Sequence, residues 1–155
     1  MTADHGGFLA TSEQMLFLRA CMQEPQEALA AWKNWRGQYA PSHLNVAQRN
    51  LLPLLYHNLQ AAGYTEPEDM DFLKQAYQES RNRVQGLWQS FEQVFKALQH
   101  GGVSPLLLKG LALGVLCYPD RHTRRMADAD VIVPFDQAEQ ALMVLQHAGW
   151  VSDET

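Results

Sequence analysis

The sequence predicts an α+β protein with an N-terminal helical bundle over residues 1–100 and a short, partial α/β core over residues 101–155. Apolar residues recur every three or four positions up to residue 100, which is the spacing of one helix face. Gly101 and Gly102 interrupt that spacing. The residues beyond them follow the order strand, helix, strand, helix, which is typical of an α/β layer.

The composition indicates a globular protein that neither spans a membrane nor binds nucleic acid in bulk. Apolar residues make up 46% and charged residues 19% of the 155 positions, so the chain is long and apolar enough to bury a core. The formal net charge of −5 argues against attachment to nucleic acid by bulk electrostatics. No apolar run approaches the roughly 18 residues that a membrane-spanning helix needs.

Two features of the sequence predict a cytoplasmic location. Cys21 and Cys117 are the only cysteines and lack the CxxC spacing of a metal site, which fits a reducing compartment. Cys117 falls in an apolar run and is interpreted as a small core residue. Residues 1–7 contain no basic segment followed by an apolar run, so we expect no signal peptide.

The helical part begins with three predicted helices. Thr11 or Ser12 caps the first, and Pro25 opens the second because the first turn of a helix tolerates proline. Pro53 either kinks the third helix or starts a fresh one, since proline cannot donate to the helical hydrogen-bond ladder. The predicted ranges are 12–22, 25–35 and 42–62.

A fourth and longer helix is predicted from Pro67 to His100. Ser80 interrupts its apolar stripe, and Gly86 weakens it by up to about 1 kcal/mol relative to alanine. Its tryptophan and phenylalanine residues are interpreted as core. The stripe consists of Leu73, Tyr77, Val84, Leu87, Trp88, Phe91, Val94, Phe95 and Leu98.

The C-terminal part is predicted as two strands and two helices. The strands cover residues 103–108 and 128–133, a short buried helix covers residues 111–117, and a polar loop covers residues 118–127. Asp136 and Glu139 form the pattern of a capping box that opens the last helix. Gly149 ends that helix, and Trp150 packs back on it.

Two aspartates in the second strand are the first candidate site. Asp128 and Asp130 stand one residue apart, so in a strand both side chains leave the same face, opposite to Ala129 and Val131. Two neighbouring carboxylates repel each other unless a cation lies between them, and a divalent metal is the usual one. The alternative is a pair of solvated acids at the end of a strand.

The turn from the first strand to the short helix is the second candidate site. Gly110 would let backbone N–H groups approach a phosphate at a helix N-terminus, and Lys109 would add a positive charge. Arg121, Arg124 and Arg125 in the following loop could contact phosphate oxygens, or could be solvated residues that offset the nearby aspartates.

Together these motifs resemble the family of uncharacterised nucleotidyltransferases, within the DNA polymerase β-like nucleotidyltransferase superfamily. The resemblance is carried over residues 103–150, and residues 45–63 are similar to the helical region that precedes the core in that family. The motifs are Leu107-Leu108-Lys109-Gly110, Tyr118-Pro119-Asp120, Arg124, Met126, Asp128-Ala129-Asp130-Val131-Ile132-Val133 and Gly149-Trp150.

The resemblance implies a small mixed sheet flanked by helices and a Mg²⁺-dependent transfer of a nucleoside monophosphate from a nucleoside triphosphate to an acceptor hydroxyl. It implies Asp128 and Asp130 as catalytic metal ligands, and Gly110 with Lys109 at the phosphate-binding turn. Arg124 is predicted to bind the nucleotide phosphates by neutralising their charge. The acceptor and the base of the nucleotide are not implied.

The chain departs from the family pattern at two places. Lys109-Gly110 stands where relatives carry Gly-Gly or Gly-Ser. A third carboxylate usually follows on a later strand, whereas here only Asp153 and Glu154 come after Trp150. Two strands also leave an open edge. We therefore expect a truncated core: a fragment, a truncated gene product, or one part of a homo-oligomer that pairs through this edge.

Two other functions fit the sequence. The chain would be a catalytically silent binding or interaction module of the nucleotidyltransferase type, which the absence of the third carboxylate favours. Alternatively, it would be a helical scaffold that dimerises through the open sheet edge and is indifferent to Mg²⁺. An active site would lose its function in Asp130→Asn, whereas a silent module would keep its binding.

Overall fold

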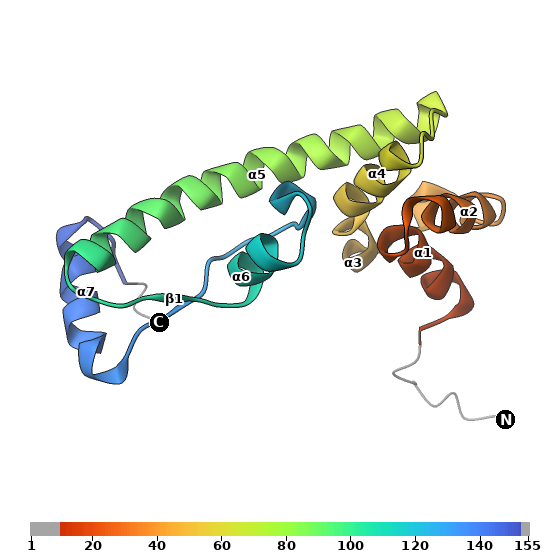
Figure 1. The fold of residues 1–155 in the computed structure, drawn as a ribbon. Helices are drawn as coiled ribbons and strands as arrows, with labels where there is room; N and C mark the ends of the chain where they lie inside the picture. The colour runs from red at the N-terminus through yellow and green to blue at the C-terminus, as the bar shows by residue number, and fades with distance from the viewer. Residues whose placement is uncertain (1–9, 153–155) are drawn as a thin grey trace, which may run out of the picture. The chain divides into compact units, whose positions relative to one another are not determined.

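The computed structural model describes residues 10–152. The N-terminal segment, on which the expectation of no signal peptide rests, and Asp153 and Glu154 lie outside the described residues. The chain divides into two compact units, Met1–Gln78 and Glu79–Thr155. The predicted boundary at residue 100 marks the end of helix α5 (Pro67–His100), whereas the contacts divide the chain within this helix. Figure 1 labels the elements along the chain.

The first unit is helical, as predicted. Thr11 and Gln14 cap each other at the start of the first helix, and Pro25 lies in the first turn of the second. The expected helix over residues 42–62 is instead three pieces, because Asn45 caps a new helix and Pro53 lies in the first turn of another. The elements are α1 (Ser12–Met22), α2 (Pro25–Arg36), η1 (Pro41–His43), α3 (Val46–Arg49), α4 (Leu52–Ala61) and the start of α5.

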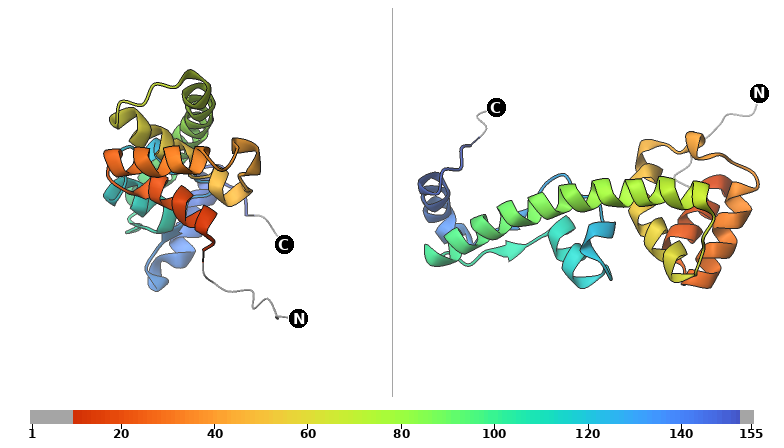
Figure 2. Two further views of the ribbon diagram at one scale, coloured as in Figure 1. Left: turned by 90° about the vertical axis from the view of Figure 1, so that its right-hand side faces the viewer. Right: turned by 90° about the horizontal axis from the view of Figure 1, so that it is seen from above.

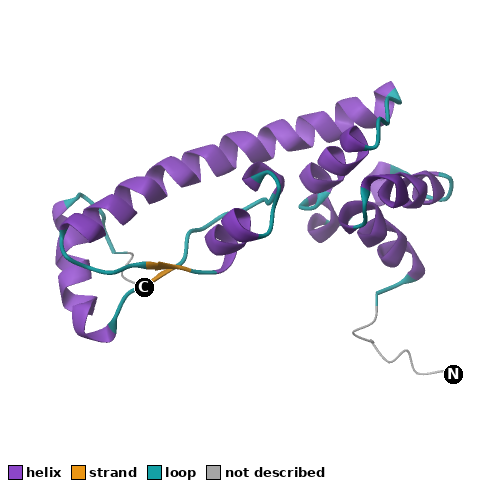
Figure 3. Ribbon diagram, in the orientation of Figure 1, coloured by secondary structure: helices purple, strands orange, loops and turns teal. Residues whose placement is uncertain are grey.

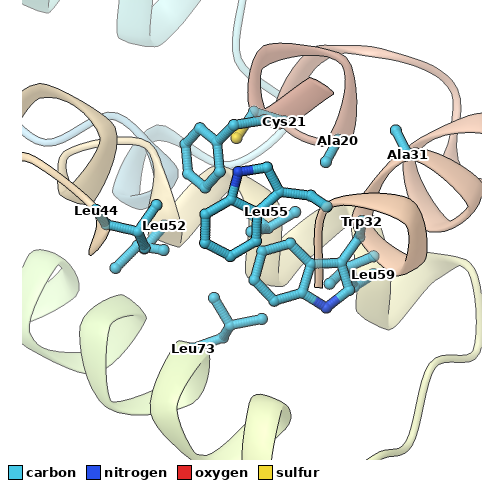
Figure 4. Packing of buried hydrophobic residues seen from close by; sticks show 11 residues of the cluster. Ala20, Cys21, Ala31, Trp32, Leu44, Leu52, Leu55, Leu59 and Leu73 are labelled. Atoms are coloured by element: carbon cyan, nitrogen blue, oxygen red, sulfur yellow. The ribbon is translucent and has the colours of Figure 1, made fainter. Parts of the chain in front are cut away.

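Aromatic rings and leucines fill the core of the first unit (Figure 4). Trp32 and Trp35 stack with ring centroids 5.2 Å apart, and both are fully buried. Leu73 of α5 completes the cluster. The buried carboxylate of Asp69 lies beside this core and accepts hydrogen bonds from Trp32 Nε1, Arg36 Nε and the Tyr64 hydroxyl at 2.8–3.0 Å. These bonds hold the start of α5 to α2.

The second unit contains the α+β part of the fold, and the predicted α+β class is confirmed. Its elements are the rest of α5, β1 (Leu106–Leu107), α6 (Lys109–Leu116), η2 (Arg121–Thr123), β2 (Val131–Ile132), η3 (Phe135–Gln137) and α7 (Ala138–His147). The two strands, orange in Figure 3, are antiparallel, so within residues 10–152 the sheet has no parallel pair.

Both strands are shorter than predicted, and prolines explain one end of the ladder. Leu106 pairs with Ile132 and Leu107 with Val131. In the same register Pro105 would face Val133, and Pro134 would face Ser104. Each proline lacks the N–H that would continue the ladder. The predicted strands over residues 103–108 and 128–133 are therefore wrong in length, although their centres are correct.

Two apolar clusters hold the second unit together. Val84, Trp88 and Phe91 of α5 pack on Leu111 of α6, which lies along this part of α5 in Figure 1. Leu98 packs on Ala141, and Figure 2 shows α7 beside the C-terminal end of α5. Cys117 is exposed, which corrects its interpretation as a core residue, because it caps the end of α6. Among residues 10–152, no helix combines the length and apolar character needed to cross a membrane.

Glycines in the left-handed conformation terminate α5 and α7. Gly102 and Gly149 have φ angles of +77° and +87°. In each case the next residue donates its N–H to a carbonyl five residues earlier, which is the Schellman arrangement, as predicted for Gly149. The predicted capping box of α7 does not form. Asp136 lies inside the η3 turn, and Gln137 occupies the cap position without a side-chain capping bond to the helix.

Candidate active site

The backbone brings the end of β1 to the residue before β2. Leu108 N donates a hydrogen bond of 3.0 Å to the carbonyl oxygen of Asp130, which extends the pairing by one residue. Helix α6 begins at the next residue, Lys109. The start of a helix and the second aspartate of the acidic pair are therefore neighbours.

Lys109 joins these two elements through both its backbone and its side chain. Its φ angle is +46°, in the left-handed region that glycine adopts freely and that costs other residues roughly 1–2 kcal/mol. Its Nζ atom lies 3.1 Å from Oδ1 of Asp130. The lysine side chain is 72% exposed and the aspartate side chain 31%, so the ion pair faces solvent. Lys109 thus adopts the backbone conformation that glycine favours, at the turn where the family resemblance implies a glycine.

Packing explains why Gly110 follows. A Cβ atom at this position would lie 2.9 Å from Sδ of Met126, whose side chain is buried. Arg124 Nε donates a hydrogen bond of 3.3 Å to the Gly110 carbonyl oxygen. The loop before the acidic pair therefore packs directly against the start of α6, and the missing side chain permits this close approach.

The three arginines of this loop have different surroundings. Besides its bond to α6, Arg124 lies over the ring of Tyr118, with its guanidinium carbon 5.7 Å from the ring centroid. Arg121 lies over Trp88 of α5 at 4.9 Å. Arg125 is exposed. The structure therefore places Arg124 at the Lys109–Gly110 turn, while Arg121 packs on α5.

Contacts with the apolar cluster of α5 alternate along the acidic segment. Ala129 and Val131 pack against the apolar cluster of α5, whereas Asp128 is exposed and Asp130 is partly exposed. This alternation is that of an extended chain, in which every second side chain leaves the same face. The two aspartates lie just before β2 rather than within it, because the ladder begins at Val131.

Hydrogen bonds to α5 hold the loop in place. Ser80, which is 3% exposed, donates from Oγ to the His122 carbonyl oxygen at 2.8 Å. The His122 ring lies between Asp120 Oδ1, 2.7 Å from Nδ1, and Gln85 Oε1, 3.3 Å from Nε2. Buried Thr123 donates to the Asp120 carbonyl oxygen at 2.6 Å. This network positions the loop that carries Arg124.

This positioning network was not predicted from the sequence. Ser80 stood out only as an interruption of the apolar stripe of the long helix. A serine within such a stripe indicates a buried polar contact, because a buried hydroxyl needs a partner. Its partner, the His122 carbonyl, lies 42 residues away and could not be identified from spacing.

The oxygen donors suit a hard divalent cation. Mg²⁺ is commonly held by one or two carboxylates together with substrate phosphates, and two carboxylates are what Asp128 and Asp130 offer. Within residues 10–152 no cluster of three or more histidine, cysteine, aspartate or glutamate side chains could hold a metal ion by itself. Two carboxylates alone would leave the other coordination positions of a magnesium ion to water or to substrate phosphates.

The second unit is an α+β core in which an acidic pair lies beside a strand-to-helix turn, as the sequence motifs predicted. The model of a family described as "Uncharacterised nucleotidyltransferase" matches residues 43–155. The chain belongs to this family, as its motifs predicted, and the membership supports nucleotidyl transfer as its general function. No curated protein and no solved structure shows significant similarity to the chain.

Proposed function

We propose that this protein transfers a nucleoside monophosphate from a Mg²⁺-bound nucleoside triphosphate to an acceptor hydroxyl, with loss of pyrophosphate. One observation carries the proposal beyond family membership. The hydrogen bond from Leu108 to the Asp130 carbonyl and the ion pair between Lys109 and Asp130 join the acidic pair to the start of α6. Metal ligands and phosphate-binding groups would therefore lie together.

Each residue of the site has a role in this proposal. Asp128 and Asp130 would hold Mg²⁺, which when bound neutralises charge on the triphosphate. Lys109 supplies a mobile positive charge, and Arg124 supplies a fixed one at the same turn. Gly110 keeps the turn narrow. Because phosphoryl-type transfer depends mainly on positioning and on charge neutralisation, these groups suit the reaction.

Binding of nucleotides tests the proposal. Mg·ATP, Mg·GTP and Mg·CTP would be titrated calorimetrically into the wild type, Asp130→Asn and the control Asp136→Asn, whose aspartate is exposed on η3. We expect metal-dependent binding that Asp130→Asn abolishes and the control retains. A well-folded wild type that binds none of the triphosphates would contradict the proposal. The preferred base would follow from the three titrations, and the acceptor would then be sought with that nucleotide.

A silent interaction module is the second candidate, and an apolar cavity favours it. Side chains of α5, β2 and α7, together with Trp150 after α7, line a volume of about 610 Å³ in the second unit. Leu106 and Ile132 are also exposed on the short sheet, whose edges would pair with a second copy. This candidate predicts that self-association persists in Asp130→Asn and does not depend on Mg²⁺.

The same proposal includes a reducing, cytoplasmic location. Cys21 and Cys117 are both free. Burial raises the pKa of the Cys21 thiol, which makes it unreactive, whereas Cys117 is exposed. Disulfide-linked dimers of the purified protein that form without reductant and are absent with reductant would agree with this location.

A further inference from the structure

The backbone at Lys109 is strained, and the strain positions a charge. A non-glycine residue at φ +46° is disfavoured, and residues held in such conformations often serve function. Glycine would adopt this angle without the steric cost. The lysine brings one feature that glycine lacks, an ammonium group 3.1 Å from Oδ1 of Asp130.

The ammonium group contacts the carboxylate that is proposed to hold the metal. A cation bound at the same Asp130 oxygen would meet the positive charge of Lys109 at close range. The lysine side chain is 72% exposed, so solvent rather than packing surrounds most of it, and it is free to swing away. The two cations therefore compete for Asp130.

We infer that Lys109 is a positioning residue that neutralises Asp130 until metal and triphosphate arrive, and that it then moves from the carboxylate to the phosphates. This inference rests on the proposed function. Lys109 has a second partner only when the triphosphate is present, so in the wild type metal and triphosphate each strengthen the binding of the other. Such coupling is reciprocal by linkage.

The test measures binding of Mn²⁺, which replaces Mg²⁺ at oxygen sites and whose free ion gives an electron paramagnetic resonance signal. Lys109→Met removes the charge, and Lys109→Gly removes the charge together with the strain. Lys96→Met is the matched control, since Lys96 is a similarly exposed lysine that pairs with Glu92 in the same unit. Each protein is titrated without nucleotide and with a non-hydrolysable triphosphate analogue.

We expect both Lys109 variants to bind Mn²⁺ without nucleotide about fivefold more tightly than the wild type, which corresponds to the ~1 kcal/mol of an exposed ion pair. The strengthening of Mn²⁺ binding by the triphosphate analogue should fall in the same variants. Lys96→Met should behave as the wild type in both titrations. Circular dichroism of each variant verifies that it is folded.

The outcomes separate this inference from the proposed function. If Asp130→Asn abolishes Mn²⁺ binding while the Lys109 variants bind as the wild type does, the metal site stands and the role of Lys109 is refuted. If the wild type binds no Mn²⁺ with or without the analogue, or if Asp130→Asn binds it normally, the metal site is wrong and the inference falls with it.

Discussion

Ser80, within the apolar stripe of α5, donates a hydrogen bond of 2.8 Å to the carbonyl oxygen of His122 in the loop before the acidic pair. The serine is buried, so its hydroxyl has exchanged water for this one carbonyl. The loop carries Arg124, which in turn bonds to Gly110 at the start of α6. A single buried hydroxyl on the helix therefore contributes to the geometry of the candidate active site.

Replacement of Ser80 should destabilise this loop. Ser80→Ala leaves the His122 carbonyl without its donor, and we expect a loss of about 1–2 kcal/mol in the free energy of unfolding. Ser90→Ala is the control, because Ser90 is an exposed serine on the same helix and gains the same helix propensity. Urea denaturation measures both. Equal stability of the two variants would show that the hydrogen bond contributes nothing.

The carboxylate of Asp69 should be far more sensitive. Asp69→Ala removes the acceptor of three hydrogen bonds and leaves the Arg36 charge unpaired, so we expect a loss of about 3 kcal/mol. The control is Asp71→Ala, because Asp71 is an exposed aspartate about half a turn further along α5. This substitution should change the free energy of unfolding by no more than about 0.5 kcal/mol. Tryptophan fluorescence during urea denaturation reports the difference, since the Trp32 indole donates one of the three bonds.

Local signals predicted those parts of the fold that depend on neighbours in the sequence. The cap at Thr11, the prolines that open α2 and α5, and the glycine that ends α7 all act over three to five residues. Each could be recognised because its hydrogen bonds close within one helical turn. Lengths that depend on a partner could not be recognised in this way. One end of the ladder stops early because, in its register, Pro105 and Pro134 would face Val133 and Ser104, which are 28 and 30 positions away in the sequence.

The same contrast applies to the site. The alternation of Asp128, Ala129, Asp130 and Val131 could be predicted from the period of a strand, and the packing of Ala129 and Val131 on the apolar cluster follows it. The conformation of Lys109 could not, since its φ angle reflects a turn that is stabilised by a partner 21 residues later. The capping box at Asp136 does not form, because the η3 turn places Gln137 at the cap position, where its Oε1 accepts a hydrogen bond from the distant Ser104 N.

The Tyr64 hydroxyl gives the first unit a dependence on alkaline pH. Its partial burial, then its hydrogen bond to Asp69 and the charge of that carboxylate, raise the pKa of Tyr64 from 10.0 to about 12. The pKa of Tyr64 is higher in the folded than in the unfolded protein. The contribution of Tyr64 to stability is therefore complete below about pH 10 and is lost as the pH rises through about 12. Tyr64→Phe should therefore be less stable than the wild type at neutral pH, and should lose less stability over this interval. Parallel slopes for the two proteins in urea denaturation would contradict the assignment.

Two glycines of the second unit should respond to alanine with opposite signs. In Gly110→Ala the new Cβ would lie 2.9 Å from Sδ of buried Met126, so Met126 must move and we expect a loss of about 1–3 kcal/mol. In Gly86→Ala the new Cβ has no heavy atom within 4 Å, apart from its chain neighbours and its own helix backbone, and α5 gains up to about 1 kcal/mol in helix propensity. Urea denaturation measures the free energy of unfolding of both variants.

Gly110→Ala should also weaken triphosphate binding, because Met126 and Arg124 both pack at this turn, whereas Gly86→Ala should leave triphosphate binding unchanged. If both variants were stabilised, the start of α6 would have room for a side chain, and packing would not explain the glycine.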